Sequence, residues 1–309
     1  MRRMSGFMGL VLAAGSLVAV GSSAVSAAPL IPPPASMAAT GDSFTVGFAT
    51  GSGSCTALTS CPEYSWSTGT AVNSHYQRLL VLNPALAGHA TNAAGPGSRM
   101  SALVSQMAAI APSHPAYVTV LLGGADICFG LTPTPTFAAQ FRAGMDALFS
   151  ASPNSRVLVG SVFNLESIRT AALAGNPSAT WSLCNTFFAA LPGARALLMA
   201  RVAEYNAVLG AECATYANCL FDGDALFDHV WSPSEVSTVD NLHPSAAGQE
   251  MISEVLFVAG YQWGLNGTSK NDCKNGGWQR FFDAQGRPFK NQGDCVSFVA
   301  TGGKNTAKG

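Results

Sequence analysis

The sequence predicts an α/β fold, a three-layer α/β/α sandwich in which helices cover both faces of a mostly parallel sheet. Short apolar runs alternate with longer amphipathic segments from residue 36 onward, which is typical of strand–helix–strand units. Apolar residues make up 48% of the chain and charged residues only 11%, as in a compact folded protein. The formal net charge of −1 gives no electrostatic case for binding to nucleic acid.

Four strands and four helices are expected. The run AYVTVLLGG at 116–124 is the strongest strand, because it is apolar, rich in β-branched residues and closed by glycines. The other predicted strands are 36–40, 88–94 and 156–163. The predicted helices are 98–111, 135–150, 185–211 and 244–260. The last of them is expected to begin at Pro244 and Ser245, which favour a first helical turn.

Residues 1–27 are expected to be a secretory signal peptide. Arg2 and Arg3 precede an apolar run at 6–20, and small residues lead to a cleavage site after Ala27. The run is too short for a good membrane span, although its retention as an N-terminal anchor is the alternative. The sequence therefore predicts a secreted, extracellular protein without a stable membrane span.

Eight cysteines remain in the exported chain, and an even count in such a protein indicates disulfides. Sequence alone does not fix the connectivity. Closeness along the chain suggests Cys55–Cys61, Cys213–Cys219 and Cys273–Cys295, which leaves Cys128–Cys184. A zinc site is the rival interpretation, but there is no Cys-x-x-Cys pair and no regular Cys/His spacing to support it.

A sharp change of composition near 264–272 predicts a boundary. Residues 28–265 contain no lysine and carry a net charge of −7, whereas residues 270–309 carry a net charge of +4. We expect a main domain at 28–265, a small cysteine-containing C-terminal module at 270–302 and a flexible tail at 303–309.

The C-terminal module resembles the short Cys-Lys-Asn-Gly-Gly-Trp tails of other secreted bacterial proteins. Its expected mini-core is too small to be stable without its disulfide. The residues of this mini-core are Trp278, Phe281, Phe282, Phe289, Val296 and Phe298. Two roles stay open: an appendage for stability or export, and an adhesion module whose positive charge and aromatic side chains favour anionic cell-envelope polymers.

Two distant stretches of the chain carry side chains suited to nucleophilic catalysis. Ser43 follows the first predicted strand, and Asp240 and His243 lie just before the last predicted helix. A serine hydroxyl needs a base to take its proton, and a carboxylate fixes the tautomer of a histidine that does so. Since sites in parallel sheets gather at the carboxyl ends of strands, Gly97 and Asp126, which also follow predicted strands, are expected at the same site.

Together these stretches resemble the GDSL, or SGNH, family of serine esterases and lipases over residues 36–262. The first family block matches Gly41-Asp42-Ser43, the second Asn92 and Gly97, and the last the run from Asp240 to Ser245. The resemblance implies a three-layer α/β fold, with Ser43 as nucleophile, His243 as base and Asp240 as its orienting partner. It also implies an oxyanion hole formed by the backbone amides of Ser43 and Gly97.

The function that this resemblance implies is a secreted serine carboxylester hydrolase, an esterase or lipase that forms an acyl-enzyme. Neither a metal nor any other cofactor is expected, since a serine triad needs none. The expected partner is a small ester or lipid substrate, and the protein is expected to be a monomer. The loops at 44–75 and 164–185, which would shape the pocket, carry no signature of a particular substrate.

The third family block is incomplete, and this leaves alternatives open. The family pattern is Gly-x-Asn-Asp, whereas this chain has Ala125 before Asp126. Loss of one oxyanion donor costs about 10²–10³ in rate. A catalytically weak hydrolase-fold binding protein is therefore one alternative, and a polysaccharide deacetylase, which would use the same triad, is another.

The remaining histidines have no matching companions in the sequence and are expected to be surface or turn residues. They are His75, His89, His114 and His229.

Overall fold

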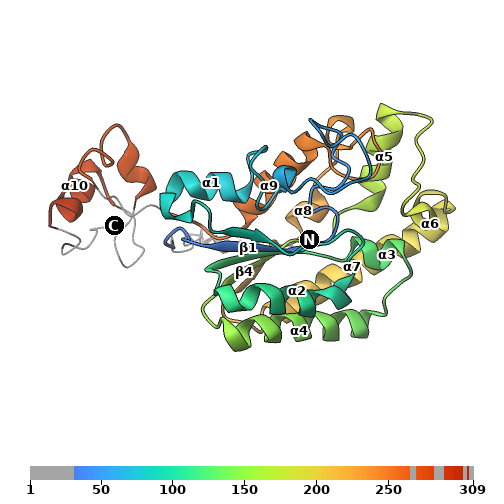
Figure 1. Ribbon diagram of the computed structural model, residues 1–309, viewed down its shortest axis with the longest axis horizontal. Coiled ribbons are helices and arrows are strands. Elements are labelled where there is room, and N and C mark those ends of the chain that lie inside the picture. Colours follow the sequence, from blue (N-terminus) through green and yellow to red (C-terminus); the bar gives the residue numbers. More distant parts are fainter. Residues whose placement is uncertain (1–30, 265–268, 282–288, 302–304, 306–309) are drawn as a thin grey trace, which may run out of the picture.

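The computed structural model describes residues 31–264, 269–281, 289–301 and 305. The centre of the fold is a five-stranded sheet in which all neighbouring strands are parallel (Figure 1). The strands, in spatial order, are β2 (Ala90–Asn92), β1 (Met37–Gly41), β3 (Tyr117–Leu121), β4 (Arg156–Val159) and β5 (Cys219–Phe221). Every residue of β1 and β3 is buried, as expected where helices cover both faces of a parallel sheet.

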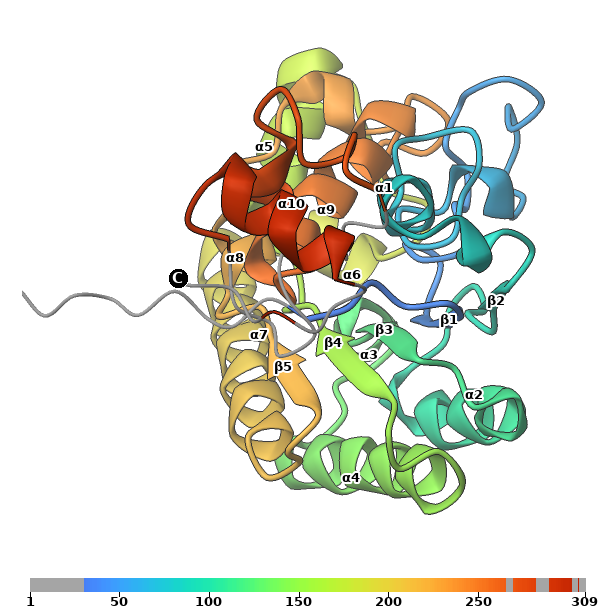
Figure 2. The same cartoon turned by 90° about the vertical axis from the view of Figure 1, so that its left-hand side faces the viewer.

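Helices on the two faces complete three layers, and Figures 1 and 2 agree on their placement. One face carries α1 (His75–Leu82), α5 (Leu165–Gly175) and α9 (Ala246–Ala259). The other carries α2 (Leu103–Ile110), α4 (Thr134–Ala151) and α7 (Pro192–Cys213). Three short helices lie in the connections, α3 (Gly124–Cys128), α6 (Asn185–Phe188) and α8 (Ala225–Asp228). The predicted fold class is confirmed.

The four predicted strands are present, and β5 is a fifth strand that is not predicted from the sequence. This strand has three residues, all only half-buried, so it shows no apolar pattern of its own. The strands β3 and β4 end earlier than predicted. The residues that follow them, 122–123 and 160–163, form connections at the carboxyl edge of the sheet, and α3 begins at Gly124.

The helical predictions differ from the structure in several respects. The helix predicted at 98–111 begins as an α-helix only at Leu103, and the helix at Gln292–Ala300 is not predicted. The predicted helix at 185–211 is divided into α6 and α7, because Pro192 occupies the first turn of α7 and cannot continue a helix from the residues before it. Neither α1 nor α5 is predicted from the sequence. Both are capped by side chains of the preceding residue, Ser74 and Asn164, whose oxygens accept from the N–H groups of Gln77 and Ser167.

All eight cysteines form disulfides in the predicted pairs, which are Cys55–Cys61, Cys128–Cys184, Cys213–Cys219 and Cys273–Cys295. The second of these joins the end of α3 to the residue that precedes α6. It therefore ties together two connections that are far apart in the sequence.

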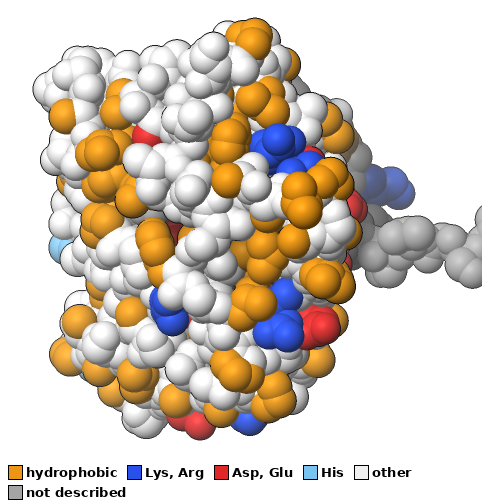
Figure 3. All heavy atoms as spheres, turned by 90° about the vertical axis from the view of Figure 1, so that its right-hand side faces the viewer, with side chains coloured by type: hydrophobic (Ala, Val, Ile, Leu, Met, Phe, Trp, Pro, Cys, Tyr) orange, Lys and Arg blue, Asp and Glu red, His pale blue; other side chains and the backbone are white. Residues whose placement is uncertain are grey.

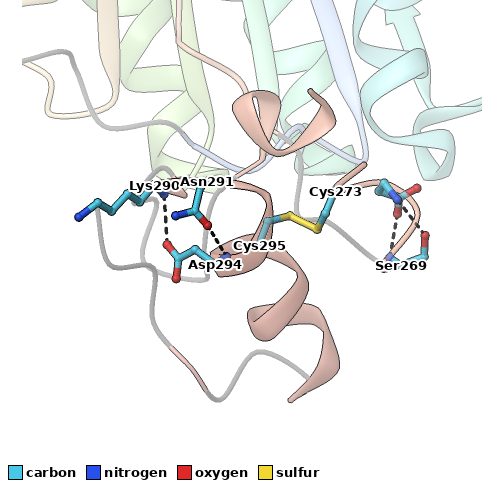
Figure 4. The surroundings of a disulfide bond; sticks show 7 residues. Ser269, Cys273, Lys290, Asn291, Asp294 and Cys295 are labelled. Carbon is cyan, nitrogen blue, oxygen red and sulfur yellow. Dashed lines mark hydrogen bonds between the residues drawn. A yellow bond between two sulfur atoms is a disulfide. The ribbon is translucent and has the colours of Figure 1, made fainter. Parts of the chain in front are cut away.

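The residues after 268 have a small apolar cluster of their own. Its buried members are Cys273, Phe281, Phe289, Cys295 and Phe298. Figure 4 shows the Cys273–Cys295 disulfide joining α10 (Gln292–Ala300) to the turn-rich segment around Cys273. Trp278 and Val296 pack against this cluster as predicted, whereas Phe282 lies outside the described residues. The division into 28–265 and 270–302 stays a prediction.

The signal peptide predicted at 1–27 also lies outside the described residues, as does the tail at 303–309 apart from Asn305. None of the helices in the described part of the chain is both long and apolar enough to cross a bilayer.

His75, the first residue of α1, is fully buried, so its prediction as a surface or turn residue is wrong. Its Nε2 lies 3.0 Å from the carbonyl oxygen of Ser253, and its Nδ1 lies 2.9 Å from the hydroxyl oxygen of Tyr117. Since a carbonyl oxygen only accepts, Nε2 carries the proton and Nδ1 accepts from the tyrosine hydroxyl. Burial lowers the pKa of His75 to about 3, although the hydrogen bond to Ser253 opposes this shift.

We expect acid to destabilise the protein through His75. Below about pH 6.5, the ordinary pKa of histidine, the unfolded chain binds a proton that folded His75 excludes down to about pH 3. The resulting loss in the free energy of unfolding is on the order of 3 kcal/mol at pH 4.5. Urea unfolding at pH 7 and pH 4.5 measures this loss.

Two variants separate His75 from other acid-sensitive groups. His75→Gln keeps a donor and an acceptor at this position but does not titrate, so it should reduce the pH dependence. His89→Gln, at an exposed histidine, should leave the pH dependence as it is. An unaltered pH dependence in His75→Gln would show that His75 is not its source.

Candidate active site

The fold brings Ser43 and His243 together from positions that are 200 residues apart. Ser43 lies on the connection that follows β1, and His243 lies on the connection that leads into α9. The Oγ of Ser43 lies 2.8 Å from Nε2 of His243. This is a hydrogen-bonding distance, so the imidazole is placed to receive the serine proton.

Asp240 holds the other side of the imidazole. Its Oδ2 lies 2.5 Å from Nδ1 of His243, and its Oδ1 accepts from the backbone N–H groups of Leu242 and His243, each at 3.0 Å. Because an ionised carboxylate only accepts, Nδ1 carries the imidazole proton and Nε2 is free to accept from Ser43. The three residues form one hydrogen-bonded chain in which Asp240 and His243 are almost fully buried.

The carboxyl groups of Asp240 and Asp42 lie in different electrostatic environments. Burial alone would raise the pKa of Asp240, but the hydrogen bond and charge of His243 and the two backbone amides hold it below the ordinary value. Burial raises the pKa of Asp42 to about 7, and the nearby charge of Asp126 adds to this effect. The carboxyl group that touches the imidazole therefore stays ionised at neutral pH, whereas the one that precedes the serine is partly protonated.

Sheet register explains why the family blocks meet. Gly41, at the end of β1, pairs with Leu121, at the end of β3, and the N–H of Asp42 donates to the carbonyl oxygen of Leu121 at 3.3 Å. The side chain of Gln106 holds both backbone groups of Gly41, accepting from its N–H at 2.8 Å and donating to its carbonyl oxygen at 2.9 Å. Gln106 is a supporting residue that the sequence analysis does not identify, and no local motif distinguishes it.

Gly97 borders the same pocket as Ser43. Its φ of +70° lies in the left-handed region that favours glycine. Within the described part of the chain, the backbone N–H groups of Ser43 and Gly97 donate to no protein acceptor. Asn92 does not line the pocket. Its Nδ2 lies 3.3 Å from the carbonyl oxygen of Thr45, so it supports the connection that carries Ser43.

Ala125 and Asp126 lie in the first turn of α3 and have different roles. Ala125 lines the pocket and offers no side-chain donor there. Asp126 is fully buried, and its carboxylate accepts from the backbone N–H of Met100 at 2.8 Å and from the hydroxyl of Thr132 at 2.5 Å. Asp126 therefore holds the connection after Gly97 against α3, which is a structural role.

The pocket beside Ser43, called here the active-site pocket, has a volume of about 230 Å³. Its apolar wall includes Phe44, Phe48, Phe163, Leu165, Leu183 and Leu242. The rings of Phe44 and Phe163 stack with their centroids 3.8 Å apart, and the ring of Phe48 lies 4.9 Å from the imidazole of His243. The Cys128–Cys184 disulfide forms part of the wall beside α3.

One group in the described part of the chain has the composition of a metal site, namely Cys55, Cys61 and Glu63. The two sulfur atoms are bonded to each other. They are therefore not available as thiolate ligands.

Residues 39–251 match the model of the GDSL-like lipase/acylhydrolase family, whereas no curated protein matches the chain. Among solved structures, TesA is 15% identical, with a TM-score of 0.48 and coverage of 72% of this chain and 97% of that chain. An extracellular lipase from Streptomyces rimosus is 21% identical, with a TM-score of 0.44 and coverage of 73% and 99%. Phospholipase A1 from Streptomyces albidoflavus NA297 is 17% identical, with a TM-score of 0.43 and the same coverage. The family match extends over more than half of this chain, so this chain belongs to the GDSL-like lipase/acylhydrolase family.

Proposed function

We propose that this protein is a secreted serine carboxylester hydrolase that works through an acyl-enzyme. The observation that carries the proposal is the hydrogen-bonded chain from Ser43 through His243 to Asp240 at the wall of an apolar pocket. Membership of the acylhydrolase family agrees with it. Four disulfides support an oxidising, extracellular location.

The reaction begins when the Oγ of Ser43 attacks the ester carbonyl carbon while Nε2 of His243 takes the serine proton. The carbonyl electron pair moves onto the oxygen, and the backbone N–H groups of Ser43 and Gly97 stabilise that oxyanion. Collapse of the tetrahedral intermediate breaks the ester C–O bond, and the leaving alkoxide receives the proton from His243. Water, activated by the same histidine, then attacks the acyl-enzyme and releases the acid. Asp240 stabilises the imidazolium in both halves.

The apolar wall of the active-site pocket favours the acyl chain as the part of the substrate that binds there. Most of the side chains that line the pocket are aromatic or aliphatic, and its ionisable lining residues are Asp42 and His243. A pocket of about 230 Å³ suits a short or medium chain.

Covalent labelling tests this proposal directly. A p-nitrophenyl alkylphosphonate should release one equivalent of p-nitrophenol and leave one adduct, which peptide mass spectrometry should place on Ser43. Folded protein that takes up no label, or takes it up elsewhere, would show that Ser43 is not an activated nucleophile.

A weakly catalytic binding protein is the second candidate, because Ala125 offers no side-chain donor to the oxyanion. The two candidates differ in turnover after the first equivalent. An acyl-enzyme that forms from a p-nitrophenyl ester and then releases acid repeatedly supports the hydrolase, whereas a single burst without turnover supports the binding protein.

Ala125→Asn should raise kcat about tenfold or more with little change in KM, since an added donor would act on the transition state. Steady-state kinetics on p-nitrophenyl butyrate measure this effect. Ala125→Gln, whose longer side chain places the amide elsewhere, is the matched control. An unchanged or lower kcat in Ala125→Asn would indicate that the oxyanion hole is complete without it or that the buried site rejects the larger side chain.

A further inference from the structure

Four large apolar side chains are exposed near the active-site pocket. They are Phe129, Leu131, Leu191 and Leu197, and we call them the apolar rim. The two leucines of the α6–α7 region are among the most exposed hydrophobic residues described, at 78% for Leu191 and 75% for Leu197. Such exposure of large apolar side chains around a pocket is typical of an interaction surface.

Contacts between the connection after α3 and α7 bring the rim residues to one surface. Arg201 and Tyr205 on α7 both donate to the carbonyl oxygen of Thr132, at 3.2 Å and 2.5 Å, so the connection after α3 packs on α7. Leu131 precedes Thr132 in that connection. Leu197 lies four residues before Arg201 on α7, which places both on the same side of the helix.

The apolar rim is continuous with the active-site pocket. An outer groove of about 480 Å³ shares the Cys128–Cys184 disulfide and Phe129 with the active-site pocket. Ala189 and Ala190 line its other side and lead directly to Leu191. Ser182, Asn185 and Thr186 also line this groove, so the surface from the wall beside Ser43, past Phe129, to the exposed end of α6 is uncharged and partly apolar.

The four rim side chains are uncharged, and the charged groups beside them are Arg99, next to Gly130, and the Arg201–Glu204 ion pair on α7, with an N–O distance of 2.9 Å. Residues 170–194 contain no charged residue and no histidine. The arginines that flank this stretch, Arg169 and Arg195, both pair with Glu166, with N–O distances of 3.5 Å and 2.8 Å. Figure 3 shows this end of the molecule, where hydrophobic side chains are spread over the face and charged groups are few.

We infer that the apolar rim docks the protein onto the surface of aggregated, zwitterionic lipid. This inference rests on the proposed ester hydrolysis and names its substrate as a lipid ester in an aggregate. The rim would enter the apolar layer, and one acyl chain would then reach the active-site pocket along the groove without crossing water. Because the rim carries no charge, docking should depend on apolar burial and not on salt.

Vesicle binding tests the inference separately from hydrolysis. The full chain with Ser43→Ala is mixed with phosphatidylcholine vesicles, and binding is measured by co-sedimentation at 0.1 M and 1 M NaCl. We expect binding at both salt concentrations. Adding Leu191→Asp and Leu197→Asp should weaken binding about tenfold or more, because two exposed apolar side chains are lost from the contact.

The matched control places the same substitution at Val81 and Val258, which are 79% and 69% exposed on α1 and α9. Val81→Asp and Val258→Asp should leave vesicle binding unchanged. With Ser43 intact, the ratio of activity on phosphatidylcholine vesicles to activity on p-nitrophenyl butyrate should fall about tenfold or more in the leucine variant alone.

Three results would overturn the docking inference: no binding by the parent, equal binding by the leucine variant, or equal loss in the valine control. Failure of the proposed function has a different signature. A protein that hydrolyses no ester but loses vesicle binding in the leucine variant alone would support the docking surface and contradict the proposed hydrolase function.

Discussion

Ser43→Ala should lower kcat on p-nitrophenyl butyrate by about 10⁵- to 10⁶-fold. Removing the Oγ removes the atom that forms the acyl-enzyme, so the other groups can no longer contribute to that path. Only binding and the backbone oxyanion donors remain to accelerate attack by water. Steady-state and single-turnover kinetics measure the loss, and the product burst should disappear with it.

A loss of structure must be separated from this loss of chemistry. Ser43 is half-buried, and its hydroxyl makes one described hydrogen bond, to His243, so the melting temperature should change little. Ser54→Ala, at an exposed serine of the same long connection, should keep full activity. A folded Ser43→Ala protein with a tenth of the parent activity would rule out Ser43 as the nucleophile.

Asp240→Asn should lower kcat by about 10⁴-fold. An asparagine amide can donate to Nδ1 of His243, which would leave the imidazole proton on Nε2 and so remove the acceptor that Ser43 needs. The same kinetic assay measures the effect, and labelling of Ser43 by the phosphonate should slow in parallel. Asp228→Asn, at an exposed aspartate, is the matched control and should have no effect.

The pH dependence of the parent enzyme gives a second check on Asp240. The folded-state pKa of this carboxyl lies below its ordinary value of 3.8, so its contribution is present above that value and is lost only as the pH falls further. Activity between pH 5 and 9 should therefore show no step from Asp240. If Asp240→Asn kept the parent's kcat, the carboxylate would have no part in orienting His243.

The sequence by itself determined the fold class, favoured the disulfide pairs that the structure contains and pointed to the side chains that meet at the candidate site. Parallel strands buried on both faces must be continuous apolar runs, and β3 shows such a run clearly. Cysteine spacing within short loops favoured three of the disulfide pairs, so the fourth followed by elimination. Ser43, Asp240 and His243 were recognisable because their neighbours in the sequence form motifs, although the motifs do not give the distances between the three side chains.

Local patterns failed where long-range contacts decide the outcome. The strand β5 exists because it pairs with β4, and its own three half-buried residues carry no signal. His75 was predicted at the surface, yet Tyr117 and Ser253, which lie far along the chain, surround and bind its ring. Gln106 supports Gly41 from 65 residues away, which no local motif can indicate.

The tertiary structure alone decided the geometry of the site and of its surroundings. The register of β1 on β3 places Asp42 beside Leu121 and so aligns the connections that carry Ser43 and Ala125. The apolar rim is likewise not recognisable in the sequence, because a leucine in or beside a helix usually faces a core. Only the packing of α7 shows that Leu191 and Leu197 face outward, since burial depends on which neighbours the whole chain provides.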